Sequence, residues 1–70
     1  MEIFKIRVKS GMFYDPRGFT SYTMNSGEKI KISSKGKIYE SEKNVRISMS
    51  FNLMTDDDVE IVTYSCKEIK

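Results

Sequence analysis

The chain has 70 residues with a formal net charge of +2 and a mass of 8.1 kDa, which is enough for one domain, residues 1–70, and excludes a second. A domain of this size buries only about 60% of its surface on folding, so it needs a disulfide, a metal or a partner subunit to stabilise it. One cysteine without any histidine excludes a disulfide and a metal centre. We therefore expect no cofactor, but a protein partner or a homo-oligomer. Isoleucine, valine, threonine, phenylalanine and tyrosine supply 24 residues, whereas alanine is missing and leucine occurs once, so the composition predicts an all-β fold.

Apolar and basic residues alternate over the first predicted strand, residues 3–9. The apolar side chains lie on one face and the basic ones on the other, namely Phe4, Ile6 and Val8 against Lys5, Arg7 and Lys9. This alternation leaves no apolar run of the kind that a signal peptide or a membrane span needs, so we expect a cytoplasmic protein without a membrane partner. Next, Asp-Pro-Arg-Gly at residues 15–18 has the composition of a type I turn, which predicts a tight reversal between strands at 12–14 and 19–24.

Three further turns are predicted, at residues 25–27, 34–36 and 42–44. They leave strands near residues 28–33, 37–41 and 45–54. The last has the strictest alternation in the chain, with apolar side chains at Val45, Ile47, Met49, Phe51 and Leu53, which predicts a central strand with one solvated face.

The final predicted strand follows a turn at residues 55–58 and begins at Val59. Both of its faces are partly apolar, so it is buried on both sides, bulged, or part of an interface. Five or six antiparallel strands with short connections predict a small meander, either an SH3-like barrel or a compact sandwich, without a substantial helix.

The sequence offers no catalytic site. Without histidine there is neither a Ser-His-Asp nor a Cys-His pair. The acidic cluster at residues 56–58 with Glu60 lacks the spacing of a calcium loop, so we interpret it as a solvated turn. We interpret Cys66 as a buried structural residue rather than a reactive thiol. The expectation is therefore a protein that is not an enzyme.

Charge is distributed unevenly along the chain. Residues 1–37 carry a net +5 and residues 38–70 a net −3. The basic side chains form two outward rows, one of Lys5, Arg7 and Lys9 and one of Lys29 and Lys31. If their strands are neighbours, the rows form a basic patch that, together with aromatic rings, binds RNA or single-stranded DNA. The alternative interpretation is that exposed lysines protect sheet edges from aggregation.

Aromatic residues cluster in the sequence around the turn at residues 15–18. The candidate partner-binding residues there are Phe13, Tyr14, Arg17, Phe19 and Tyr22. Phenylalanine, tyrosine and arginine are enriched in protein interfaces, so the cluster predicts an anchor for a protein partner. A domain this small also needs such side chains for its own core.

No family motif is recognisable, so function rests on analogy of size and composition. The lysine- and isoleucine-rich composition is typical of an AT-rich bacterial or phage genome, and short β proteins of this kind occur among phage and mobile-element products that bind a host factor. The expected function is a non-catalytic binding module that modulates or inhibits a host protein in a bacterial cytoplasm. Nucleic-acid binding and structural self-assembly are the alternatives.

Overall fold

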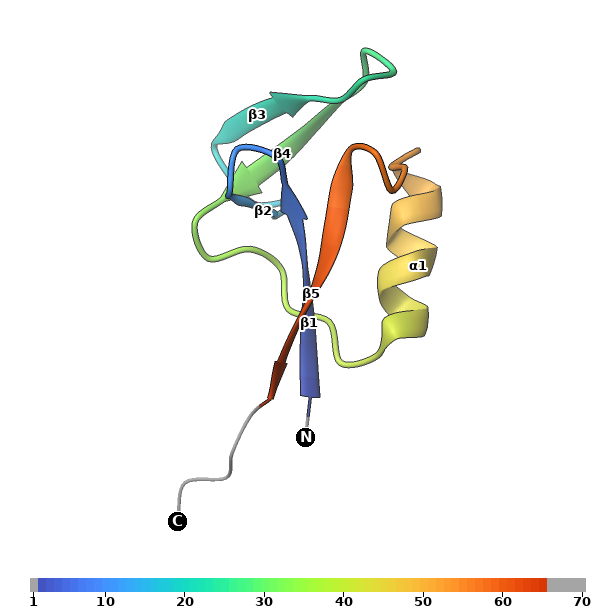
Figure 1. Ribbon diagram of the computed structural model, residues 1–70. Coiled ribbons are helices and arrows are strands. Elements are labelled where there is room, and N and C mark those ends of the chain that lie inside the picture. The colour runs from blue at the N-terminus through green and yellow to red at the C-terminus, as the bar shows by residue number, and fades with distance from the viewer. Residues whose placement is uncertain (1, 66–70) are drawn as a thin grey trace.

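The structure is a computed structural model that describes residues 2–65. Its elements are β1 (Glu2–Val8), β2 (Phe13–Tyr14), β3 (Thr20–Thr23), β4 (Lys29–Ser33), α1 (Glu42–Phe51) and β5 (Val59–Ser65). The strands form one antiparallel sheet in the order β3-β4-β2-β1-β5 (Figure 1). The prediction of a mostly antiparallel β fold is confirmed, but the sheet is open, with β3 and β5 as its edges, and does not close into a barrel.

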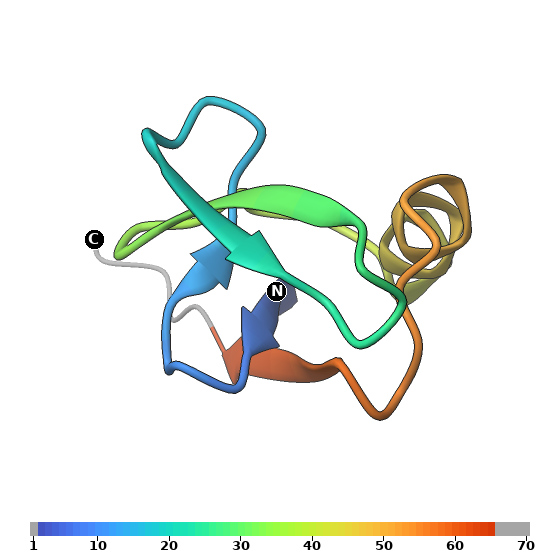
Figure 2. The same cartoon turned by 90° about the horizontal axis from the view of Figure 1, so that it is seen from above.

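The two faces of the sheet follow the alternation predicted for β1. Ile6 and Val8 are buried and Phe4 packs against the core they belong to, whereas Lys5 and Arg7 lie on the opposite face. Directly paired residues share a face of a sheet, so the pairing of Arg7 with Phe13 places Phe13 beside these basic residues. We call this side the outer face. Viewed from above, the sheet curls and α1 stands on the core side (Figure 2).

The turn at residues 15–18 forms, but it does not join two paired strands. The Gly18 N–H donates to the Asp15 carbonyl at 2.9 Å. Tyr14 in β2 and Thr20 in β3 nevertheless pair with opposite sides of the same residue, Ile32 of β4. The predicted reversal between adjacent strands is therefore wrong, because the chain crosses β4. The crossing is so close that a Cβ atom at Gly18 would lie 2.2 Å from the Ile32 carbonyl oxygen.

The stretch predicted as a central strand, residues 45–54, is mostly α1, and the prediction of no substantial helix is wrong. Residues 42–44, predicted as a turn, are the first residues of this helix. Ser41 is its N-cap, since the Ser41 hydroxyl accepts a hydrogen bond from the Asn44 N–H at 3.2 Å, which satisfies one of the free donors at the start of the helix. Val45 and Met49 are buried, and their spacing of four places them on one helical face.

The end of α1 has an unusual residue in a common motif. The Met54 N–H donates to the Met49 carbonyl at 2.8 Å and the Leu53 N–H to the Ser50 carbonyl at 3.2 Å, which is the Schellman pattern. The residue that reverses the chain there normally is glycine, because its φ is positive. Here it is Leu53, with φ 57°.

The predicted strand at residues 37–41 is an irregular segment that contacts the sheet through Lys37, whose N–H donates to the Tyr14 carbonyl at 2.8 Å, and through Tyr39. The Phe4 N–H donates to the Tyr39 carbonyl at 2.8 Å, and the Tyr39 N–H donates to the Phe4 carbonyl at 2.9 Å. The Tyr39 hydroxyl lies 2.7 Å from the Ser48 hydroxyl of α1. Tyr39 therefore ties the helix to β1.

β5 is confirmed as a strand and pairs with β1 in seven consecutive positions, from Glu2 with Ser65 to Val8 with Val59. This continuous register excludes a bulge over these residues, and only Val59 is fully buried, so two of the three interpretations of this strand are wrong. Cys66 lies outside the described residues. Within residues 2–65 no helix is both long and apolar enough to cross a bilayer.

Candidate functional site

The aromatic residues predicted as one anchor are distributed over different parts of the molecule. Tyr14 belongs to the core and Tyr22 packs against it. Phe13 lies on the outer face, and Phe19 is fully exposed. Only Arg17 and Phe19 line a common hollow, of about 330 Å³. The structure therefore does not bring the five predicted side chains into one surface.

The two basic rows also remain apart. β2 lies between β1, which carries Lys5 and Arg7, and β4, which carries Lys29 and Lys31, and Lys9 follows β1 in the connection to β2. The Arg7 guanidinium is paired with Glu60 of β5, Nε to Oε1 being 2.6 Å. The condition for one basic patch, neighbouring strands, is not met.

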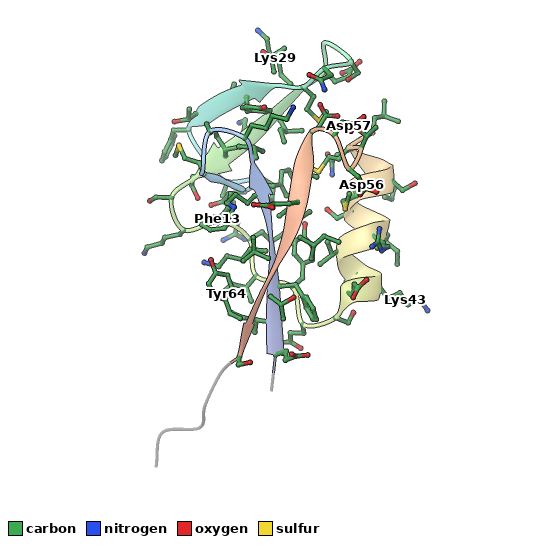
Figure 3. The ribbon with its side chains drawn as sticks, in the orientation of Figure 1. Phe13, Lys29, Lys43, Asp56, Asp57 and Tyr64 are labelled. Carbon is green, nitrogen blue, oxygen red and sulfur yellow. The ribbon has the colours of Figure 1, made fainter. Side chains whose placement is uncertain are left out.

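Lys5 instead belongs to a small cluster of aromatic rings on the outer face. Its ammonium lies 4.9 Å from the centroid of the Phe13 ring and 5.5 Å from that of Tyr64, and it donates to the Lys35 carbonyl at 2.6 Å. Figure 3 shows Phe13 and Tyr64 on the side of the sheet away from α1. A cation between two rings is held by the negative faces of the aromatic systems.

The acidic cluster contains a structural carboxylate rather than three solvated ones. Asp58 is only 2% exposed and accepts hydrogen bonds from the Asn25 N–H and the Thr55 hydroxyl, both at 2.8 Å. These bonds, that from Asn25 first, hold the pKa of Asp58 below its ordinary value. Asp56 and Asp57 are exposed on the loop before β5 (Figure 3). Among residues 2–65 no three acidic or cysteine side chains are placed to hold a metal ion.

An exposed surface with three large apolar side chains lies between α1 and residues 37–40, a region that we call the helix groove. Ile38, Ile47 and Phe51 line it and are 56%, 51% and 86% exposed. The groove has a volume of about 530 Å³. Its remaining lining is polar or charged and consists of Lys37, Tyr39, Glu40, Asn44, Ser48 and Asn52.

One hydrogen bond joins the two walls of the helix groove, and a second lies within the helix wall. Tyr39 bonds Ser48 across the groove, and the Asn52 side-chain amide donates to the Ser48 carbonyl at 2.8 Å. Burial raises the pKa of Tyr39, the bond to Ser48 opposing this in part, so the phenol stays neutral at physiological pH. The bond between Tyr39 and Ser48 therefore links the segment at residues 37–40 to α1.

Sequence reasoning missed the helix groove because it assigned Ile47 and Phe51 to the inward face of a strand. In a helix these residues are four apart and share a face, but that face lies away from Val45 and Met49. Two signals favoured the helix: the N-capping serine at position 41 and the spacing of four between Val45 and Met49.

The lining of the helix groove combines apolar side chains with two charged ones, Lys37 and Glu40. Protein interfaces commonly combine apolar and charged side chains in this way. The chain matches no protein-family model, no curated protein and no solved structure at a significant level.

Proposed function

We propose that this chain is a non-catalytic module that binds a protein partner through the helix groove. The observation that carries the proposal is the joint exposure of Ile38, Ile47 and Phe51 along one groove. Exposed apolar side chains are common singly, but three large ones around one hollow mark an interaction surface. When its helix groove binds the partner, the module covers a surface of the partner and thereby modulates the partner's activity.

The exposure of Phe51 favours a macromolecular partner. Its ring is 86% exposed and therefore protrudes from the surface instead of lining a closed cavity. An aromatic ring of this kind gains free energy when it enters a pocket of a partner, at about 25 cal/mol per Å² of apolar area buried. Small-molecule sites, in contrast, enclose most of their ligand.

The charges around the groove give the complex an orientation. The Lys37 ammonium lies 5.4 Å from the centroid of the Tyr39 ring, and Glu40 borders the same groove. A partner surface is complementary to these two charges if it has an apolar centre, an acidic group opposite Lys37 and a basic group opposite Glu40. Such border charges steer association and select the partner more than they add affinity.

Phe51→Ala tests the proposal, with Phe19→Ala as the matched control, since both rings are strongly exposed and only Phe51 lines the groove. The tagged proteins are used to capture partners from cells of the source organism after nuclease treatment. We expect Phe51→Ala to lower the affinity for the captured protein by at least about 30-fold, as at an interface hot spot. Its unfolding free energy should change by less than about 0.5 kcal/mol, as for a surface substitution.

Equal capture by the wild-type chain and Phe51→Ala would contradict the proposal, and so would loss of capture by Phe19→Ala alone. The circular dichroism melting curve of each variant shows whether a loss of binding reflects a loss of fold. A partner that is captured only when the nuclease treatment is omitted would instead point to nucleic acid.

A second candidate function is the binding of single-stranded nucleic acid on the outer face, and the cluster of Lys5, Phe13 and Tyr64 favours it. Proteins of that class stack bases on aromatic rings beside cations, and Tyr64 is exposed. This function predicts that a labelled oligonucleotide binds in fluorescence anisotropy with an affinity that falls steeply as salt rises. Tyr64→Ala should weaken that binding by about 1–3 kcal/mol, and binding that does not depend on salt would exclude it.

A further inference from the structure

β5 forms a free edge of the sheet. It stands last in the strand order, and in Figure 2 no other element of residues 2–65 lies beyond it on the side away from β1. Edge strands of soluble proteins are usually short, bulged, or protected by lysine or proline, because an unprotected edge pairs with another chain. The seven residues of β5, Val-Glu-Ile-Val-Thr-Tyr-Ser, contain neither proline nor lysine and pair with β1 without a bulge.

The hydrogen bonds of Phe4 show which groups of β5 point outward. The N–H and the carbonyl of Phe4 both bond Tyr39, so they point away from β5. In an antiparallel pair the residues that bond the neighbouring strand alternate with those that do not. The odd-numbered residues of β1 therefore bond β5, and their partners in β5 are the even-numbered residues.

The odd-numbered residues of β5 consequently direct their backbone groups to the free edge. For Ile61 and Thr63 these are two N–H donors and two carbonyl acceptors. The N–H of Val59 is already used, because it donates to the Thr55 carbonyl at 3.2 Å. The accessible edge is thus centred on Val62, between Ile61 and Thr63.

The side chains of β5 are compatible with a second β5 in antiparallel orientation. About a two-fold axis at Val62, Ile61 lies opposite the partner's Thr63 and Glu60 opposite the partner's Tyr64. Glu60 is the only charged residue of the strand and is paired with Arg7 of its own chain, so no like charges meet. β-branched and aromatic residues occupy the other central positions, and these pair well across strands.

We propose that β5 pairs antiparallel with β5 of a second copy of this chain, about a two-fold axis at Val62, so that two sheets become one continuous sheet. A second copy is favoured over an extended segment of another protein because, in this register, the outward backbone groups of Ile61 meet those of the partner's Thr63 and no like charges meet. The same contact on both copies gives a closed two-fold dimer. It also explains why both faces of this strand are partly apolar.

Val62→Lys tests the dimer, with Ser21→Lys on the other edge strand, β3, as the matched control. Both positions face the outer side of the sheet, and each lies directly opposite a lysine of its own chain, Val62 opposite Lys5 and Ser21 opposite Lys31. Both variants therefore carry a similar like-charge cost in the monomer. Only the Val62 variant also places two lysines opposite each other at the dimer axis. By sedimentation velocity we expect the wild-type chain and Ser21→Lys at twice the chain mass of 8.1 kDa. Val62→Lys should sediment at the single mass with an unchanged circular dichroism spectrum.

A mixture of Val62→Lys and Val62→Asp should restore the dimer mass, since opposite charges then meet at the axis, whereas each variant alone stays monomeric. The proposal is overturned if the wild-type chain remains at the single mass up to about 1 mM, a concentration above which even weak association is half complete. It is also overturned if Val62→Lys is as dimeric as the wild-type chain. Phe51→Ala should remain dimeric, which separates this test from that of the helix groove.

Discussion

Asp58 shows how a single side chain can connect distant parts of the chain. It comes directly before β5, yet its carboxylate accepts a hydrogen bond from the backbone of Asn25, in the turn between β3 and β4. A second oxygen accepts from the Thr55 hydroxyl. Sequence analysis places Asp58 among three equivalent aspartates, because nothing local distinguishes the one that meets a distant N–H.

These hydrogen bonds make the stability of the protein depend on pH. The pKa of Asp58 is lowered from 3.8 in the fold, by the Asn25 N–H first and then by Thr55. Ionised Asp58 therefore contributes its full stabilisation at pH values above its ordinary pKa in the unfolded chain. This contribution is lost as the pH falls from there through the lowered pKa of the folded chain. Asp58→Asn removes the titrating group, so its unfolding free energy should decrease less between about pH 7 and pH 3 than that of the wild-type chain.

Urea denaturation at the two pH values measures the effect, and Asp57→Asn, at the exposed neighbour, is the control that should behave like the wild-type chain. Some acid sensitivity should remain in Asp58→Asn, because the pKa of Asp15 is also lowered, by hydrogen bonds from the Ser33 hydroxyl and the Arg17 N–H. An identical decrease in Asp58→Asn and the wild-type chain would contradict the prediction.

Among the elements, α1 shows where pattern recognition fails. Five apolar residues at every second position between 45 and 53 satisfy a strand. In the structure Val45 and Met49 are buried on one face of α1, Ile47 and Phe51 are exposed, and the fifth residue, Leu53, follows the helix. The helix is also stabilised by contacts that no local pattern contains, such as the bond between the hydroxyls of Tyr39 and Ser48. In contrast β1, β3, β4 and β5 were predictable, because each alternates or is bounded by a clear turn.

The backbone conformation of Leu53 lowers the stability of the fold at the end of α1. Its positive φ of 57° costs a non-glycine residue about 1–2 kcal/mol, and its side chain is 62% exposed, so little packing compensates. Leu53→Gly should therefore raise the unfolding free energy by about 1 kcal/mol. The greater flexibility of glycine in the unfolded chain reduces this gain in part. Chemical denaturation followed by circular dichroism measures it.

Leu53→Ala is the matched variant, because it removes the same side chain but keeps a Cβ atom at the positive φ. Its unfolding free energy should stay within about 0.5 kcal/mol of the wild-type value. A destabilised Leu53→Gly beside an unchanged Leu53→Ala would show that the backbone at this position is not strained.

At the scale of the whole molecule, composition indicated the fold class and left the topology open. The scarcity of alanine and leucine predicted a sheet, and the sheet dominates. The insertion of β4 between β2 and β3 depends on the fit of Gly18 against Ile32, which is a contact between distant residues. The helix groove was equally hidden, because it needs the helix and the segment around Ile38 to be placed side by side.

The pairing of Glu2 with Ser65 allows the chain to be circularly permuted. Paired residues of an antiparallel ladder lie about 4.5–5.5 Å apart, so a short glycine linker can join residue 65 to residue 2, with new termini opened at Ser26 in the β3–β4 turn. This circular permutant should keep the native circular dichroism spectrum. Its β1–β5 ladder becomes a local hairpin, whereas in the natural order Arg7 and Glu60 are 53 residues apart.

Refolding of the permutant should therefore be faster than that of the natural chain, because closing a long loop delays non-local strand pairing. Stopped-flow fluorescence of the tyrosines after dilution from urea measures both rates. Equal rates would mean that the first and last strands join only after the rate-limiting step. Slower refolding of the permutant would instead indicate that the hairpin of β3 and β4, whose strands the new termini at Ser26 separate, forms the folding nucleus.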